Sequence, residues 1–443
     1  GPAAFLDKIP SYLALVLSPG RSEPTLVSVG AERDVEAKVR AWRREVSAVP
    51  QGLAQAGNRA EARYRQAGEA LRRMVWDPVA KHLKGAHRVF VVPDGAMSLV
   101  SLATLPMGED RYIVEAEPVI HYLSAERDLV RDEKSAGSGQ SLLVLGGPDF
   151  DADPRAAASN LQSRSAVPKA GDGSLAGGSP PPPTPAGGKA TFRGQRSACA
   201  AFRSLKFQPL PASRAEAVAI GSLWTRRSGE GAQGSADVVE MLGGQATEAE
   251  FKQRVQDYQV IHLATHGFFV DDRCSSTLDE TIEYQEEGRR SGKGGERNTA
   301  DNPLLLTGLA LAAANRREQA GDGEDGILTA EEIASLDLSR VKWAVLSACE
   351  TGLGRVQAGE GVLGLRRAFE VAGASTLIMS LWPVEDSAAL EWMEHLYEGR
   401  LGGLSTDAAV RDASLTMIES RRKAGRSTHP FTWGAFVAAG DWK

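Results

Sequence analysis

Cys349 and His266 are the two residues of this sequence whose types and positions could together perform nucleophilic catalysis. His266 follows the apolar run Val260–Ala264, and Cys349 follows the apolar run Trp343–Ser347. Runs of this length and composition are typical of buried parallel strands, whose carboxyl ends gather the functional groups of an α/β sheet. If the two strands are neighbours, the thiol and the imidazole lie side by side as a nucleophile and a proton carrier.

Gly267 adds a second element of such a site. Because glycine has no side chain, its backbone N–H can approach an oxyanion closely, together with the N–H of Cys349. Taken singly, a cysteine after a strand is usually a small core residue, and a lone histidine is usually a satisfied polar group. Their joint occurrence at two strand ends, each followed by a glycine-containing turn, favours catalysis.

Metal and nucleotide chemistry are less well supported by the sequence. His262 and His266 are four residues apart, but the HxxxH spacing lacks the glutamate of a metallopeptidase and falls on an apolar strand. We therefore expect His262 to be buried and expect no metal or other cofactor. A phosphate-binding loop is not indicated either, because no phosphate-loop pattern is formed by the nearby glycines Gly352, Gly354, Gly359 and Gly361.

The elements that must position these residues alternate between strand and helix in the second half of the chain. Apolar runs predict strands at residues 142–145, 260–264, 343–347 and 375–381. Helices are predicted at 248–256, with Thr247 as N-cap, at the capping box of Thr329 and Glu332, and at 361–371. The alternation predicts an α/β fold with a mainly parallel sheet covered by helices on both faces.

The first half is expected to form a unit of its own. It has strand patterns at 12–17, 25–29 and 89–92, and a helical pattern over 31–83 that is broken at residues 50–52. We predict an N-terminal subdomain over residues 1–139 and a catalytic domain over 140–443. Two stretches of the second half, about 151–194 and 271–301, are rich in small and polar residues and are expected to be disordered inserts.

Composition and charge exclude several classes of protein. With 51 Lys and Arg against 57 Asp and Glu, the formal charge of −6 argues against a mainly electrostatic binder of nucleic acid or anionic membrane. No apolar run approaches 18 residues, and no signal peptide is visible. The three cysteines Cys199, Cys274 and Cys349 are odd in number and form no CxxC pair, which favours a reducing, cytoplasmic setting over a disulfide scaffold.

The residues around the candidate pair resemble a known family, the CHAT domain. The resemblance rests first on the segment from Val260 to Phe269 and on the segment from Val345 to Gly352. It continues at residues 93–95, 142–150, 301–305, 326–333, 359–365, 380–384, 433–437 and 440–442. CHAT domains are caspase- and separase-related peptidases that are often attached to tetratricopeptide repeats.

The resemblance implies a caspase-like fold, a degenerate peptidase-like N-terminal subdomain and a cysteine endopeptidase with His266 and Cys349 as its dyad. The substrate would be a protein or peptide, and an activating partner or attached repeats are implied. The sequence departs from caspases in the residues around Cys349 and in the dyad spacing of 83 residues, against about 50 in caspases. The caspase preference for aspartate is therefore not carried over. Because the chain starts with Gly1-Pro2, typical of a cleaved tag, we expect a longer natural protein.

Specificity residues are harder to assign. Asp149 and Asp386 both follow predicted strands, where a carboxylate could bind a P1 Arg or Lys, and Glu360 in a glycine-rich turn is a third candidate. Each of them could instead be a cap or a surface carboxylate. Trp382 could line a peptide cleft or cover the core. The alternative function is a latent or non-proteolytic signalling or scaffold module.

Overall fold

The computed structural model describes residues 9–48, 54–83, 85–130, 141–154, 205–229, 237–269, 303–305, 307–321, 323–348, 355–357 and 361–443. Within these ranges, no helix combines the length and the apolar character needed to cross a membrane.

A single eight-stranded sheet forms the centre of the molecule, in the order β3-β6-β17-β16-β13-β9-β7-β8. Its strands are β3 (Arg88–Val91), β6 (Val119–Tyr122), β7 (Ser141–Pro148), β8 (Asp237–Gly243), β9 (Val260–Ala264), β13 (Trp343–Ser347), β16 (Thr376–Ser380) and β17 (Phe436–Gly440). Neighbouring strands are parallel except at the β16–β17 pair. The predicted α/β class with a mainly parallel sheet is confirmed.

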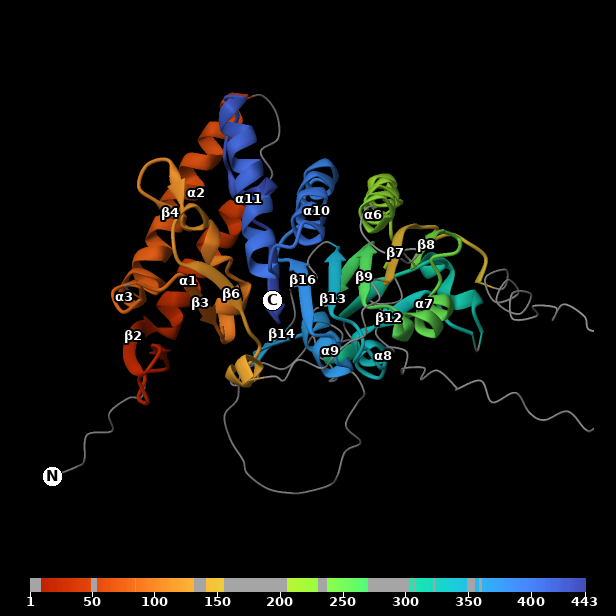
Figure 1. Ribbon diagram of the computed structural model, residues 1–443, viewed down its shortest axis with the longest axis horizontal. Helices are drawn as coiled ribbons and strands as arrows, with labels where there is room; N and C mark the ends of the chain where they lie inside the picture. The colour runs from red at the N-terminus through yellow and green to blue at the C-terminus, as the bar shows by residue number, and fades with distance from the viewer. Residues whose placement is uncertain are drawn as a thin grey trace, which may run out of the picture.

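Helices cover the sheet on both sides (Figure 1). On one side lie α6 (Pro211–Gly229) and α10 (Asp386–Leu401), and on the other lie α8 (Ala330–Ala334) and α9 (Leu365–Ala372). Beside β3 and β6 stand α1 (Glu32–Val46), α2 (Ala54–Val75) and α11 (Thr406–Lys423), with the short α3 (Asp77–Ala80) after α2. Because both faces are covered, β9 and β16 are buried at every position, as continuously apolar strands require.

His262 is the polar exception inside this core. It lies in the middle of β9 with no exposed surface, its Nε2 is 3.0 Å from Glu216 Oε1 of α6, and its Nδ1 is 3.1 Å from Tyr397 Oη of α10. Buried polar groups are stable only when they are hydrogen-bonded, and here both ring nitrogens have partners. The histidine therefore ties two covering helices to the sheet, and its expected burial is confirmed.

The N-terminal half contributes strands to the same sheet as the C-terminal half, since β6 pairs with β17. The domain boundary predicted at 139/140 falls in residues 131–140, outside the described residues, and the division into two domains remains a prediction. The predicted inserts, 151–194 and 271–301, lie outside the described residues except for 151–154. At the sheet edge β3 is half-exposed, because no strand of the described residues pairs with its outer side.

One predicted helix begins later than expected. Residues 361–371 were predicted as helical, but Gly361–Leu363 forms β15, which pairs with β14 (Arg355–Gln357). Helix α9 starts only at Leu365, after Gly364 with a positive φ of 153°. Glycine adopts such a backbone conformation at little cost and thereby separates the strand from the helix. The predicted N-cap at Thr247 and the capping box of Thr329 and Glu332 are both confirmed.

Besides the β14–β15 pair, the described residues form three smaller sheets. An antiparallel hairpin joins β1 (Ser11–Val16) to β2 (Thr25–Ala31), and another joins β4 (Pro106–Met107) to β5 (Arg111–Tyr112). The third is a three-stranded antiparallel sheet of β10 (Gly267–Phe269), β11 (Thr307–Ala310) and β12 (Ile327–Thr329). This third sheet matters most for the site, because β10 begins at the residue after His266.

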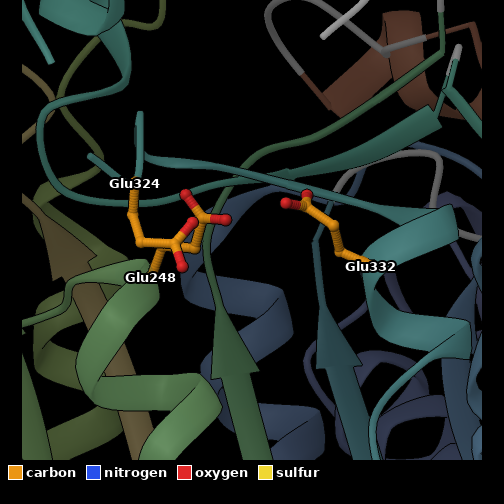
Figure 2. A group of neighbouring side chains, drawn as sticks. All are labelled: Glu248, Glu324 and Glu332. Atoms are coloured by element: carbon orange, nitrogen blue, oxygen red, sulfur yellow. The ribbon is translucent and has the colours of Figure 1, made fainter. Parts of the chain in front are cut away.

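A buried lysine holds the surroundings of β12 together. Figure 2 shows Glu248 of α7 (Glu248–Arg254), Glu324 and Glu332 of α8 pointing toward one another. Lys252 Nζ lies 2.6 Å from Glu248, 3.0 Å from Glu332 and 3.1 Å from Glu324, and its side chain has no exposed surface. A second oxygen of Glu248 accepts the N–H of Gly326, directly before β12. The ammonium group thus links α7, α8 and the start of β12.

The charges in this group shift one another's protonation. Burial would raise the pKa of Glu332, but Lys252 and the hydrogen bonds from Thr329 hold that pKa below its usual value. Burial, followed by the charge of Glu332, holds the pKa of Glu248 well above its usual value. A carboxyl group whose pKa is lowered by folding stabilises the folded state at pH values above its unfolded pKa. This stabilisation is lost as the pH falls through the folded pKa. Lys252, together with the hydrogen bonds from Thr329, is therefore the source of the stability that Glu332 contributes.

The substitution Lys252→Met is expected to lower the free energy of unfolding by about 3–5 kcal/mol near pH 7.5, because it leaves buried carboxylates without their cation. The loss should shrink at pH 5, where the unpaired carboxyl groups take up protons. Urea unfolding at both pH values measures this, with Lys423→Met as the control, since the Lys423 side chain is 80% exposed. An equal loss at both pH values would contradict the assignment.

Candidate active site

The two strands that carry the candidate pair are direct neighbours in the sheet. β9 and β13 are parallel, and the last paired residues are Ala264 and Ser347. His266 and Cys349 each follow these paired residues by two positions. The expectation that the two strands are adjacent is therefore confirmed. Cys349 lies outside the described residues, and Ala348, the residue before it, is buried.

His266 is half-buried and is held by a backbone carbonyl. Its Nε2 lies 2.9 Å from the carbonyl oxygen of Gln208, just before α6. Because a carbonyl oxygen only accepts, Nε2 must carry a hydrogen and donate it. In the neutral imidazole the lone pair then resides on Nδ1. The arrangement thus fixes which ring nitrogen is available as a base.

Two phenylalanine rings pack around the imidazole. The ring centroids of Phe150 and Phe207 lie 5.4 and 5.8 Å from that of His266, with interplanar angles of 41° and 34°. Both phenylalanines are buried and belong to a small apolar cluster with Ala310, Ala314 and Ile327. The two phenylalanine rings also contact each other, with centroids 5.8 Å apart. Because both rings pack against it, the His266 ring has less space to turn.

The backbone of His266 is fixed as well. Its carbonyl oxygen accepts the N–H of Ala310 at 2.9 Å, so the end of β9 is attached to β11. Gly267 then opens β10 and faces Leu309 across the pair. Gly267 follows the anchored His266 directly, and its role as an oxyanion donor remains a prediction.

Asp149 and Asp386 both follow strand ends as expected, and both are exposed. Asp149 follows β7, which neighbours β9, and it precedes Phe150, whose ring packs on His266. One oxygen of Asp149 accepts the N–H of Asp151 at 3.1 Å. Asp386 begins α10 after β16. A carboxylate in the first turn of a helix also interacts favourably with the helix dipole. Glu360 lies outside the described residues.

The expectation that Trp382 lines a peptide cleft needs correction. Its side chain is 1% exposed, its Nε1 donates to the carbonyl of Phe431 at 3.3 Å, and its ring packs edge-on against Trp42 of α1. A side chain without accessible surface offers no contact to a substrate. The alternative weighed from the sequence, a core residue, is the one that the structure favours.

Sequence reasoning missed the residues that surround His266. Phe150 could have been found, since it follows Pro148-Asp149 at a predicted strand end. Gln208 and Phe207 follow a long low-complexity stretch, and their contribution comes from tertiary packing and a backbone carbonyl. No pattern of residue types reveals such a role.

Within the described residues, one carboxylate group is compact enough to suggest a cation site, the group of Glu248, Glu324 and Glu332. The Lys252 ammonium already lies at hydrogen-bond distance from all three carboxylates. It supplies the positive charge that a metal ion would otherwise bring. We therefore assign this group a structural role.

Among solved structures, the chain is similar to the complex of the pro- and mature domains of RgpB from Porphyromonas gingivalis. That likeness has a TM-score of 0.40 at 11% identity and covers 93% of this chain and 76% of that one. The separase of the Saccharomyces cerevisiae separase–securin complex gives a TM-score of 0.37 at 10% identity, over 79% of this chain and 15% of that one. TM-scores this low support no inference about function.

The curated relatives are named after tetratricopeptide repeats. The chain is 27% identical to tetratricopeptide repeat protein 28 of Mus musculus over 210 residues, which is 45% of this chain and 8% of that protein. The human protein of the same name is 26% identical over 211 residues. The chain thus spans about 8% of the length of the mouse relative. A family model for the CHAT domain matches residues 65–441, which is most of the chain, and the chain therefore belongs to the CHAT domain family.

Proposed function

We propose that this chain is a cysteine endopeptidase in which Cys349 is the nucleophile and His266 the proton carrier. The observation that carries the proposal is the parallel pairing of β9 and β13, with Ala264 opposite Ser347. His266 and Cys349 each lie two positions after the paired strand ends, which supports their proximity in space. The hydrogen bond from His266 to the Gln208 carbonyl adds to this support, because it leaves Nδ1 free to exchange a proton.

In the proposed mechanism, the Cys349 thiolate attacks the carbonyl carbon of the scissile peptide bond. The resulting oxyanion accepts hydrogen bonds from the N–H groups of Gly267 and Cys349, a contribution of about 3 kcal/mol per donor in comparable sites. The proton that the thiol lost to form the thiolate is held on Nδ1 of His266, which gives it to the leaving amine as the C–N bond breaks, and a thioester with Cys349 remains. Water then hydrolyses the thioester, and His266 takes up the proton that the water loses.

We also propose that Asp149 recognises a basic P1 residue of the substrate. The support is positional, because Asp149 is exposed and directly precedes Phe150, which touches the His266 ring. A carboxylate accepts two hydrogen bonds from a guanidinium group, which gives both charge and geometric complementarity.

Cys349→Ala and His266→Ala are each expected to reduce cleavage of a proteome-derived peptide library by a factor of about 10³ or more. The physical reason is that one variant lacks the nucleophile and the other lacks the proton carrier. Mass-spectrometric counting of new peptide termini measures the effect. The matched control is Cys274→Ala, which removes another thiol. Cleavage that survives Cys349→Ala would sink the assignment of the nucleophile.

Asp149→Asn is expected to lower kcat/KM for peptides with Arg or Lys at P1 about 10- to 100-fold, while other peptides are unaffected. The loss corresponds to about 1.5–3 kcal/mol for hydrogen bonds to a charged group. Asp386→Asn serves as the comparison, since Asp386 is the rival carboxylate at a strand end. If Asp386→Asn shows the selective loss and Asp149→Asn does not, the P1 assignment moves to Asp386.

A second candidate function, a non-proteolytic interaction module, is favoured by an exposed apolar face on the β1–β2 hairpin. Leu13, Leu15 and Leu26 lie on this face with 59%, 69% and 61% of their surface exposed. An exposed cluster of large aliphatic side chains is typical of a protein contact surface. As its partner we propose amphipathic helices of tetratricopeptide type, after the names of the curated relatives.

The library digestion separates the two functions when it is repeated with the repeat region of the mouse relative added. Cleavage that appears only with the repeats, and is lost in the double variant L13S/L15S, supports a peptidase under partner control. Repeat binding without any cleavage in either condition supports the interaction module. Because both leucines are exposed, the double variant is expected to fold like the unchanged chain.

A further inference from the structure

Asn315 lies where two segments that flank His266 come together. It belongs to a short 3-10 helix, Ala314–Gln319, that follows β11, and it is half-buried. The residue two positions earlier, Ala313, has a positive φ of 74° and donates its N–H to the carbonyl of Asp149 at 3.0 Å. Residues other than glycine rarely adopt this conformation, and when they do they tend to cluster at functional sites.

The side-chain amide of Asn315 makes two hydrogen bonds to the backbone of Phe207, one with its N–H and one with its carbonyl oxygen. Asn315 Oδ1 accepts the N–H of Phe207 at 2.8 Å, and Asn315 Nδ2 donates to the carbonyl of Phe207 at 2.9 Å. This pattern imitates the pairing of a neighbouring strand. It fixes the peptide groups on either side of Phe207, and the carbonyl of the next residue, Gln208, holds His266.

The same residue also fixes the segment after β7. The backbone N–H of Asn315 donates to the carbonyl of Phe150 at 2.8 Å, and Nδ2 donates to Asp151 Oδ1 at 3.1 Å. Phe150 and Phe207 are the two rings that pack on the imidazole. One asparagine therefore connects both aromatic contacts of His266 and the segment that supplies its carbonyl acceptor.

We propose that Asn315 is a positioning residue for His266, acting through Phe207, Gln208 and Phe150. The catalytic part of this inference rests on the proposed peptidase function, whereas the positioning part rests on the hydrogen bonds alone. An asparagine suits the task because its amide offers an acceptor and a donor side by side, as a backbone peptide does. Aspartate has the same shape but no donor, and it would place a second carboxylate against Asp151.

The test compares Asn315→Ala and Asn315→Asp with Gln319→Ala, a control in the same short helix whose side chain contacts Arg316. Side-chain nitrogen NMR, with the His266 signal assigned through His266→Gln, reports the Nε2–H tautomer of His266 without requiring any activity. We expect the unchanged chain and the control to show this tautomer. Both Asn315 variants should lose it, or exchange the Nε2 proton with solvent at least tenfold faster.

Peptide cleavage gives the second readout. For Asn315→Ala we expect kcat to fall about 10- to 100-fold with little change in KM, because small displacements of a reacting group have effects of this size. The double variant N315D/D151N should regain part of the activity lost in N315D, since the asparagine at 151 restores a donor and removes the charge repulsion. Asn315→Asp preserves the side-chain volume, so a folding failure of Asn315→Ala leaves the test intact.

The two proposals fail in distinguishable ways. An unchanged His266 signal in folded Asn315→Asp overturns the positioning role, whatever the activity. If Asn315→Asp loses the His266 signal and the unsubstituted chain cleaves no peptide, the positioning role stands. The peptidase function is then contradicted.

Discussion

The parallel pairing of β9 with β13 is the constraint on which the rest of the site depends. Backbone hydrogen bonds set Ala264 opposite Ser347, and a shift of register by one residue would turn each side chain to the other face of the sheet. Both strands are apolar and covered on both sides, so their burial fixes the register as well. This pairing therefore sets the relative positions of the strand ends that His266 and Cys349 follow.

Polar groups placed inside the apolar structure refine that geometry. His262 connects β9 to α6 and α10, and Lys252 connects α7 and α8 to the start of β12. Such groups are costly to bury and become strongly destabilising when one partner is removed. The contacts around His266 are less buried: the Gln208 carbonyl accepts a hydrogen bond from the imidazole, and the amide of Asn315 holds the neighbouring Phe207.

Much of the central fold could be predicted from residue patterns alone. β9 and β13 were predicted with the bounds that the structure has, because five consecutive apolar or buried positions leave little choice of structure. The capping box at Thr329 was predicted for a similar reason, since its hydrogen bonds are local. The start of α9 was missed because Gly364 interrupts a segment that looks helical by composition. The sequence left Trp382 open between a cleft and the core, because its burial depends on α1, which lies far away in the sequence.

The central claim is that Cys349 is a nucleophile activated by its neighbour His266. Its most direct test is covalent labelling with an arginyl chloromethyl ketone, followed by tandem mass spectrometry of all three cysteines. The account predicts an adduct on Cys349 that forms at least tenfold more slowly in His266→Ala, with Cys199 and Cys274 largely unlabelled. Equal labelling of the three cysteines, or a rate on Cys349 that does not depend on His266, would contradict it.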